Sequence, residues 1–191
     1  MNLLDNVQDR ASRIVLNYGK LAQLAQSLHG IGLRTVVTIG TFDMIHVGHS
    51  RYLERARSHG DILIVGVDSD RAVKIYKDET RPMVPEDERM EMLLHTRYVD
   101  FVTLVDDVDD DGKWAYGLVS VVKPSTFVAV EDSYPQEQLQ IIESFCDELV
   151  VLPRQAETST SETMRRALMA QTKPVGDQLR RIADKLDKGE L

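Results

Sequence analysis

The sequence predicts an α/β protein built on a doubly wound parallel sheet of about five strands, with added N-terminal and C-terminal helices. Short continuous runs of apolar, often β-branched residues are typical of parallel strands that are buried on both faces. Segments with helical spacing of apolar residues separate these runs, and this alternation favours right-handed crossovers in one sheet. A chain of 191 residues is long enough for one such domain.

Two helices are expected before the first strand. Apolar residues recur every three or four positions from Leu3 to Tyr18, which indicates an amphipathic helix. A second helix is expected over residues 20–29 and ends at the glycines that follow it. Residues 1–33 are therefore interpreted as an N-terminal helical segment.

Strands and helices alternate over residues 34–172, which we expect to form one domain. Strands are expected at residues 35–39, 62–67, 99–105, 127–130 and 149–152. Helices are expected at residues 50–58, 70–76, 85–95, 114–122, 136–145 and 162–170. Pro174 and Gly176 then predict a break, so that residues 173–191 form a charged helical tail.

Charge and cysteine content narrow the class of protein. The net charge of −8 argues against a nucleic acid or an anionic membrane as partner, because both are usually met by a basic surface. The single cysteine, Cys146, cannot form an intramolecular disulfide, which favours a reducing compartment and a cytoplasmic location. Residues 1–10 do not have the pattern of a signal peptide, and the sequence lacks the roughly 20-residue apolar run of a membrane span.

The segment Gly40–His49, with the sequence GTFDMIHVGH, directly follows the first expected strand. Ligands of open parallel sheets bind at the carboxyl ends of the strands. Gly48 lies at the expected start of a helix, where free amide groups and the helix dipole favour an anion. His46 and His49 are three residues apart and can face one phosphate, whose developing charge an imidazole stabilises. The segment therefore predicts a phosphate site.

Other residues of this segment have supporting roles in the hypothesis. Gly40 allows a bulky group to approach the backbone closely. Thr41 offers a hydroxyl and an amide to the same anion. Asp43 can orient a histidine or contact a hydrated metal ion. A transition-metal site built from His46, His49 and Asp43 is the competing interpretation.

The pattern of GTFD, two further residues and HxGH resembles the signature of the cytidylyltransferase-like nucleotidylyltransferases. The resemblance covers about residues 34–170 and implies a Rossmann-like fold. It also implies catalytic roles for His46 and His49. The nucleotide-binding residues that it implies within the segment are Gly40, Thr41, Phe42, Asp43 and Gly48.

The loop after the second strand carries a second block that matches the family. Taken alone, its mixture of cations and acids is more often a solvated surface. In the family a lysine at this place reaches the nucleotide phosphates, and an arginine opens the helix that follows. The resemblance assigns these roles to Lys77, with Lys74 as competitor, and to Arg89.

Two branches of the family match different residues of this chain. Arg81-Pro82 followed by Glu88-Arg89 resembles the heptose-phosphate adenylyltransferase branch, which uses ATP. Asp70 and Arg97, together with Asp100, resemble the glycerol-phosphate cytidylyltransferase branch, which uses CTP. Asp100 can also simply hold the start of a strand. Taken together, these matches slightly favour CTP over ATP as the nucleotide.

A third block combines Arg154 with four successive hydroxyl residues, Thr158 to Ser161. Hydroxyl residues before a helix cap it, and a row of them with free amides also binds phosphate. The block resembles the family's second motif, an arginine followed by (I/V)STT. On that match Arg154 clamps phosphates, and the β- and γ-phosphates are held by Ser159, Thr160 and Ser161.

The clearest departure from the family is at the end of the fourth strand. Asp132 matches the family's aspartate near the base and ribose, but Glu131 stands where the family commonly has glycine. A carboxylate at that position leaves the choice of base open.

The resemblance implies transfer of a nucleotidyl group from CTP or ATP to a phosphorylated small molecule, such as a polyol or sugar phosphate, with release of pyrophosphate. His46, His49, Lys77 and Arg154 would carry the catalysis. Mg²⁺ would enter largely with the triphosphate, with Asp43 as the nearest carboxylate.

Three further interpretations remain open from the sequence. The chain could be a nucleotide-binding regulatory module without transfer activity. It could also be a metal-dependent hydrolase that uses His46, His49 and Asp43. The amphipathic N-terminal helix makes a homodimer a reasonable expectation.

Overall fold

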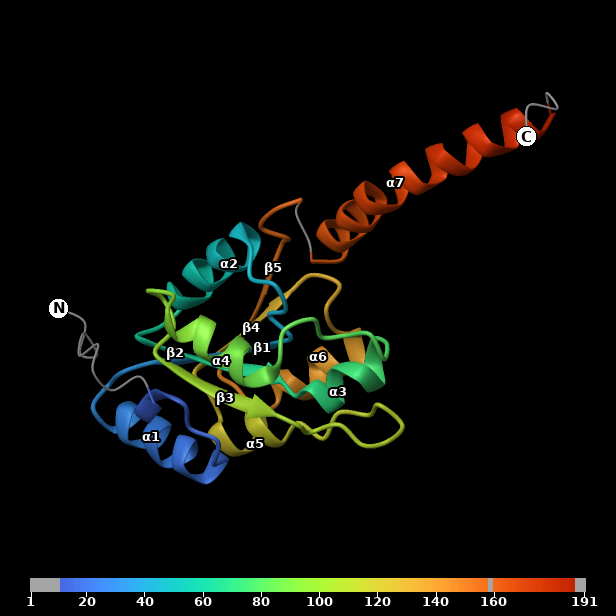
Figure 1. Cartoon of the computed structure of the whole chain (residues 1–191). Coiled ribbons are helices and arrows are strands. Elements are labelled where there is room, and N and C mark those ends of the chain that lie inside the picture. Colours follow the sequence, from blue (N-terminus) through green and yellow to red (C-terminus); the bar gives the residue numbers. More distant parts are fainter. Residues whose placement is uncertain (1–10, 158–159, 188–191) are drawn as a thin grey trace.

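A computed structural model describes residues 11–157 and 160–187, and in it five strands form one parallel sheet (Figure 1). The spatial order is β3-β2-β1-β4-β5, so the direction of winding reverses between β1 and β4. The strands are β1 Thr35–Gly40, β2 Ile62–Asp68, β3 Phe101–Val105, β4 Thr126–Val130 and β5 Glu148–Leu152. The predicted doubly wound, Rossmann-like parallel sheet is confirmed.

Helices cover both faces of the sheet, because adjacent residues of each strand point to opposite sides. One core cluster joins Val36 and Leu63 to α2 and α4, and a second joins Val37 and Ile64 to α1, α5 and α6. The helices are α1 Tyr18–Gly30, α2 Val47–Arg57, α3 Asp70–Tyr76, α4 Glu86–Leu94, α5 Gly117–Val122, α6 Gln136–Glu143 and α7 Thr160–Asp187.

The chain before α1 differs from the expected amphipathic helix. Residues 11–13 form a short 3-10 turn, and Ile14 makes a parallel bridge with Val102 of β3. The N–H of Val15 donates to the carbonyl of Val102 at 2.9 Å. β3 is one of the two outer strands of the sheet, and its open edge offers hydrogen bonds that override the helical spacing of the apolar residues. Residues 1–10, which carry the rest of the expected helix, lie outside the described part.

The C-terminal segment is one helix rather than two. The expected break near Pro174 is absent from the described residues, because α7 continues through this proline to Asp187. The expected boundary between residues 172 and 173 therefore falls inside a helix. Beyond its first turns α7 extends away from the sheet (Figure 1). Within the described ranges the chain has no helix that is long and apolar enough to cross a membrane.

Candidate active site

The Gly40–His49 segment lies at the carboxyl end of the central strand, next to the reversal of strand order. Gly40 ends β1, and His46 is the N-cap of α2. In open α/β sheets this is the position at which ligands bind. The predicted location of the phosphate site thus follows from the topology.

His46 and His49 form a reciprocal cap at the start of α2. Nδ1 of His46 accepts from the N–H of Gly48 at 3.1 Å, and Nδ1 of His49 accepts from the N–H of His46 at 3.3 Å. The ring centroids lie 4.0 Å apart. Since both Nδ1 atoms accept, the neutral rings carry their protons on Nε2 and can donate them to a ligand.

The environment keeps the two histidines neutral. Burial, with smaller contributions from His46 and Lys77, lowers the pKa of His49 to about 4. Burial also lowers the pKa of His46. At neutral pH the site therefore offers two neutral Nε2–H donors rather than two imidazolium ions.

Gly48 leaves room for the histidine pair. A Cβ atom at this position would lie 2.9 Å from Cε1 of His46 and 3.2 Å from Cβ of Ala156. Phe42 is buried and supports the other side of the pair, with its ring centroid 5.5 Å from that of His49. Gly48 and Phe42 thus shape the site through packing around the histidines.

Two adjoining cavities open at the end of β1. The first, called here the histidine cavity, measures about 340 Å³ and is lined by His46, His49 and Arg154 among others. The second, called here the aromatic cavity, measures about 400 Å³ and includes Trp114 and Gln138. Residues that line both are Ile39, Gly40, Thr41, Lys77, Ser133 and Tyr134.

Lys77 lies at the border of the two cavities. Its Nζ donates to Oγ1 of Thr41 at 2.8 Å. Burial lowers its pKa, and the nearby Arg81 lowers it further. Lys77, Thr41 and the histidines are therefore brought together as the sequence predicted, whereas Lys74 lines neither of these cavities.

The aromatic cavity contains residues that the sequence analysis missed. Oδ2 of Asp68 accepts from the hydroxyl of Tyr76 at 2.6 Å and from Oγ1 of Thr41 at 3.3 Å. Trp114 and Tyr134 stack with centroids 5.6 Å apart. Asp68 ends β2, so its position at the carboxyl end of a strand was a signal that could have identified it.

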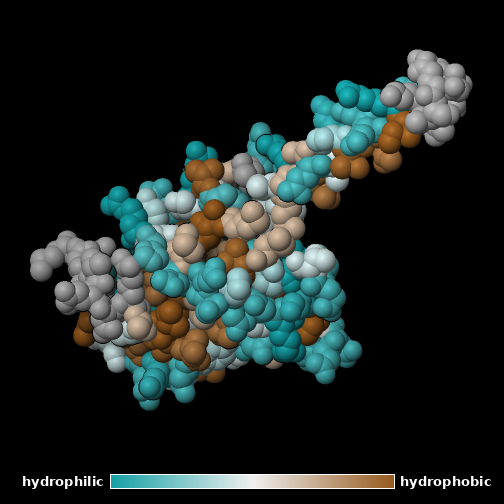
Figure 2. Space-filling view, viewed as in Figure 1, coloured by the Kyte–Doolittle hydropathy of each residue, from teal (hydrophilic) through white to brown (hydrophobic). Residues whose placement is uncertain are grey.

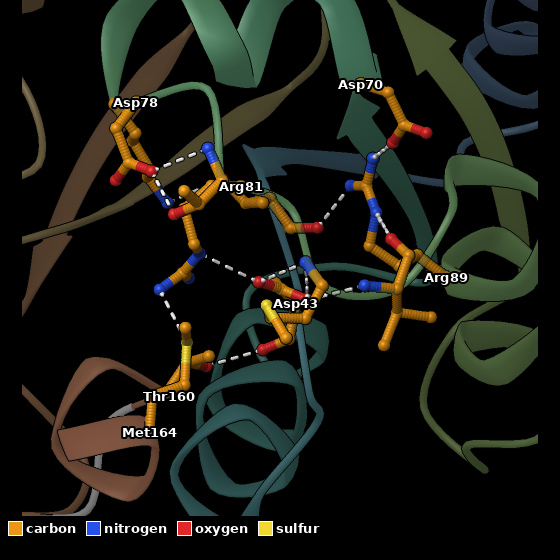
Figure 3. Close-up of polar contacts among 12 residues, drawn as sticks. Asp43, Asp70, Asp78, Arg81, Arg89, Thr160 and Met164 are labelled. Carbon is orange, nitrogen blue, oxygen red and sulfur yellow. Dashed lines mark hydrogen bonds and ion pairs between the residues drawn. The ribbon is translucent and has the colours of Figure 1, made fainter. Parts of the chain in front are cut away.

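Asp43 joins its own segment to the loop that carries Arg81 and to the start of α7 (Figure 3). Its Oδ2 lies 3.0 Å from Nε of Arg81 in a buried ion pair, and its carboxylate accepts the N–H groups of Met83 and Val84 at 3.1 Å. The hydroxyl of Thr160 donates to the carbonyl of Asp43. These contacts account for the carboxylate structurally, and contact with Mg²⁺ stays a prediction.

The metal-site interpretation involves His46, His49 and Asp43. They contain no group of three or more His, Cys, Asp or Glu side chains placed to hold a metal ion. The residues that line the histidine cavity include no carboxylate in this part of the chain. Mg²⁺ keeps several waters and binds substrate phosphates readily, so it would be carried by the triphosphate rather than by a dedicated protein site.

Arg89 braces the ends of β1 and β2 from inside the protein (Figure 3). It is 1% exposed and donates to the carbonyls of Thr41, Asp68 and Val84. It also forms an ion pair with Asp70 at 2.6 Å. Arg89 therefore lies next to the site, as the resemblance implied. Arg89 and Asp70 support the strand ends, however, and line neither cavity.

Arg97 and Asp100 lie before β3, at the opposite end of the sheet from the histidines. Asp100 accepts the N–H of Leu63 at 2.8 Å and pairs with Arg57 at 3.0 Å. Arg97 is exposed and lies over the ring of Tyr98. The structure does not bring Arg97 to the site, and Asp100 holds the start of a strand.

Glu131, which stands where the family commonly has glycine, makes two hydrogen bonds that a structural role explains. Its Oε1 accepts the N–H of Arg154 at 2.9 Å, and its own N–H donates to the carbonyl of Leu152 at 2.8 Å. These bonds join the loops after β4 and β5 and position Arg154 at the histidine cavity. Asp132 is exposed, has a positive φ of 62° and lines neither cavity.

The hydroxyl block is only partly described. The Thr160 side chain is buried against the Gly40–His49 segment, and Ser161 is exposed in the first turn of α7. Ser159 lies outside the described residues. A phosphate-binding role for these three residues stays a prediction.

Two neutral histidines thus lie at a helix N-terminus on the edge of a parallel sheet, with Lys77 and Arg154 lining the same cavity, an arrangement suited to phosphate groups. Residues 37–173 match the family described as Cytidylyltransferase-like, and the chain belongs to that family.

Comparison with individual proteins agrees with this assignment. The chain is 34% identical over 152 residues to the bifunctional protein HldE of Aliarcobacter butzleri, covering 80% of this chain and 30% of that protein. It is 32% identical over 133 residues to HldE of Geobacter metallireducens, covering 69% and 26%. The chain thus spans less than a third of the length of these relatives.

Solved structures show the same fold. A lipopolysaccharide core biosynthesis protein from Thermoplasma volcanium is 25% identical with a TM-score of 0.53, covering 67% of this chain and all of that one. A pantoate-beta-alanine ligase from Francisella tularensis is 15% identical with a TM-score of 0.52, covering 78% and 68%, and shows the fold alone.

Proposed function

We propose that this chain transfers an adenylyl group from ATP to the phosphate of a sugar phosphate and releases pyrophosphate. The observation that carries the proposal is the shared border of the two cavities. The histidine pair faces one cavity, the second lies beside it, and Lys77 lines both. Two substrates can therefore meet at the Nε2–H donors.

In the proposed step an acceptor phosphate oxygen attacks the α-phosphorus of the triphosphate. The new P–O bond forms as the bond from the α-phosphorus to the bridging oxygen breaks, and that oxygen leaves with pyrophosphate. A phosphate dianion is already nucleophilic, so catalysis depends on position and electrostatics. His46 and His49 donate to the α-phosphate, while Lys77 and Arg154 hold phosphate oxygens.

The sequence slightly favours CTP as the nucleotide. The positions of the branch-specific residues in the structure favour ATP instead. Arg81 and Arg89, from the block that resembles the adenylyltransferase branch, directly support the Gly40–His49 segment through Asp43 and Thr41. Arg97 and Asp100, from the block that resembles the cytidylyltransferase branch, lie at the opposite end of the sheet. Of the residues that resemble the cytidylyltransferase branch, only Asp70 lies near the site, where it pairs with Arg89. The preference for CTP is therefore weakened.

The aromatic cavity supports a sugar phosphate as acceptor. Stacked Trp114 and Tyr134 provide apolar surface, and Asp68 and Gln138 provide polar groups that hydroxyls recognise. Cavities that bind small molecules commonly combine such surfaces. The similar structure from Thermoplasma volcanium is described as a lipopolysaccharide core biosynthesis protein. We also propose a cytoplasmic location, where ATP and sugar phosphates are available and Cys146 stays reduced.

A pyrophosphate-release screen tests the proposal. Four nucleoside triphosphates, with Mg²⁺, would each be combined with the phosphates of glycerol, ethanolamine, heptose and riboflavin. We expect release with ATP and the heptose phosphate, dependent on both. Release with CTP and glycerol phosphate would keep the reaction class and overturn the choice of substrates. Calorimetric binding of ATP without release from any pair would instead favour a regulatory module.

A further inference from the structure

α7 presents an apolar stripe that the body of the molecule does not cover. Contacts of Thr160 with Asp43 and of Met164 with Arg81 hold its start. The helix then runs outward for most of its 28 residues (Figure 1). Hydrophobic residues lie along one side of the projecting helix in Figure 2.

The stripe has the spacing of a coiled coil. Leu168, Thr172, Val175, Leu179 and Ile182 follow one another at alternating steps of four and three residues, as do the a and d positions of a heptad repeat. Leu168 and Leu179 are each 62% exposed, and Val175 is 58% exposed. A narrow seam of this kind fits a second helix.

The projecting helix is poorly suited to stand alone. It contains Pro174, which removes an intrahelical hydrogen bond, and Gly176, which weakens helix formation. Helices in proteins gain most of their stability from packing of an apolar face. We therefore expect the apolar stripe of α7 to pack against a partner.

We propose that α7 pairs in antiparallel orientation with α7 of a second copy of this chain. In one register Val175 contacts Leu179 of the partner subunit, and Thr172 contacts Ile182 of the partner subunit. The same register places the two copies of Gly176 near the twofold axis. A glycine there lets the helices approach closely.

Charge selects the antiparallel orientation. The first half of α7, residues 160–173, carries three cations and one carboxylate, Glu162, which pairs with Arg165 and Arg166. The second half, residues 174–187, carries three cations and three carboxylates. Antiparallel pairing sets the cationic first half of one helix beside the second half of the other, while parallel pairing sets the cationic halves together.

The charge on the rest of the chain also favours the antiparallel orientation. The whole chain has a net charge of −8, although residues 165–184 carry five cations against two carboxylates. The rest of the chain is therefore more acidic still, and two such bodies repel each other. An antiparallel pair holds them at opposite ends of helices about 42 Å long.

A membrane surface is the competing occupant of a basic amphipathic helix. Such helices usually carry Trp or Phe on the apolar face, and residues 160–187 contain no aromatic residue. The narrow aliphatic seam thus favours a protein helix.

Sedimentation of the full chain over 1–100 µM tests the pairing. We expect a species of twice the 21.6 kDa chain mass. Leu179→Asp should give the monomer mass over the same range, and Ala170→Asp, on the opposite side of the helix, should leave the dimer intact. Circular dichroism checks that both variants fold. A monomeric wild-type chain, or a Leu179→Asp variant that still dimerises, would overturn the proposal.

Cysteine cross-linking tests the orientation in a Cys146→Ser background. Antiparallel pairing predicts a disulfide when Thr172→Cys and Ile182→Cys chains are mixed, and none with either chain alone. Disulfides between two copies of the same variant, Thr172→Cys or Ile182→Cys, would establish parallel pairing and contradict the proposal. Co-sedimentation of a monomeric wild-type chain with phosphatidylglycerol vesicles would likewise refute it and assign the stripe to a lipid surface.

Discussion

At the scale of single residues, the proposed reaction depends on the histidine pair. Each Nδ1 accepts a backbone N–H at the start of α2, which leaves Nε2–H as the donor toward the cavity. Removing one preorganised donor to a developing negative charge costs on the order of 100- to 1,000-fold in turnover. The pair is thus the part of the site most sensitive to substitution.

We expect His49→Ala to lower kcat about 1,000-fold while the protein stays folded, as measured by steady-state pyrophosphate release and circular dichroism. Arg97→Ala is the matched control and should retain normal turnover, because Arg97 is exposed at the other end of the sheet. A kcat within a few fold of wild type for His49→Ala would remove this histidine from the mechanism.

The titration of His49 gives a second prediction. Its folded pKa of about 4 lies below the ordinary value of about 6.5, so the folded chain binds fewer protons than the unfolded chain between these values. This histidine should therefore reduce folding stability as the pH falls from about 6.5 to 4. NMR of the free protein should show His49 neutral and protonated on Nε2 from pH 5.5 to 8. Titration near pH 6.5 would contradict this.

At the scale of elements, the start of α2 depends on the space beside Gly48. We expect Gly48→Ala to displace the His46 ring, because the added Cβ would lie 2.9 Å from its Cε1. Turnover should fall at least about 100-fold, as when one donor is lost, with little change in thermal stability. Gly176→Ala, where nothing lies within 4 Å of a Cβ, is the control. Equal turnover in both variants would show that the ring position is unimportant.

The loop before α4 is held by the buried pair of Asp43 and Arg81. Asp43→Asn should destabilise the protein by about 3 kcal/mol in urea unfolding, since it leaves a buried guanidinium without its counter-charge. The exposed Asp78→Asn should change stability by less than about 0.5 kcal/mol. If Asp43→Asn left the stability unchanged but made turnover less dependent on Mg²⁺, the result would support the metal role instead.

The sequence predicted the sheet and the histidine segment because both are local patterns. The strands are continuous apolar runs, and the motif directly follows one of them. Arg89 could not be placed this way, because its carbonyl partners Thr41 and Asp68 lie 48 and 21 positions away. The same holds for Ile14, whose bridge to Val102 depends on which strand of the sheet is outermost.

At the scale of the whole molecule, the strand order brings distant segments to one edge. β1 contributes the Gly40–His49 segment, β2 contributes Asp68, and β5 leads to Arg154. The reversal between β1 and β4 lies where ligands of open parallel sheets bind, and there the proposed reaction places its two substrates. Spacing in the sequence identified the motif, but only the folded structure shows that two cavities share Lys77.

The position of the ATP phosphorus that reaches the acceptor tests the central claim most directly. ATP labelled with ³²P at either the α- or the γ-position would be incubated with heptose phosphate, Mg²⁺ and the chain. The proposed reaction predicts α-label in the sugar product and γ-label in pyrophosphate. Appearance of γ-label in inorganic phosphate or in the sugar, with no α-label transferred, would contradict nucleotidyl transfer and indicate a hydrolase or a kinase.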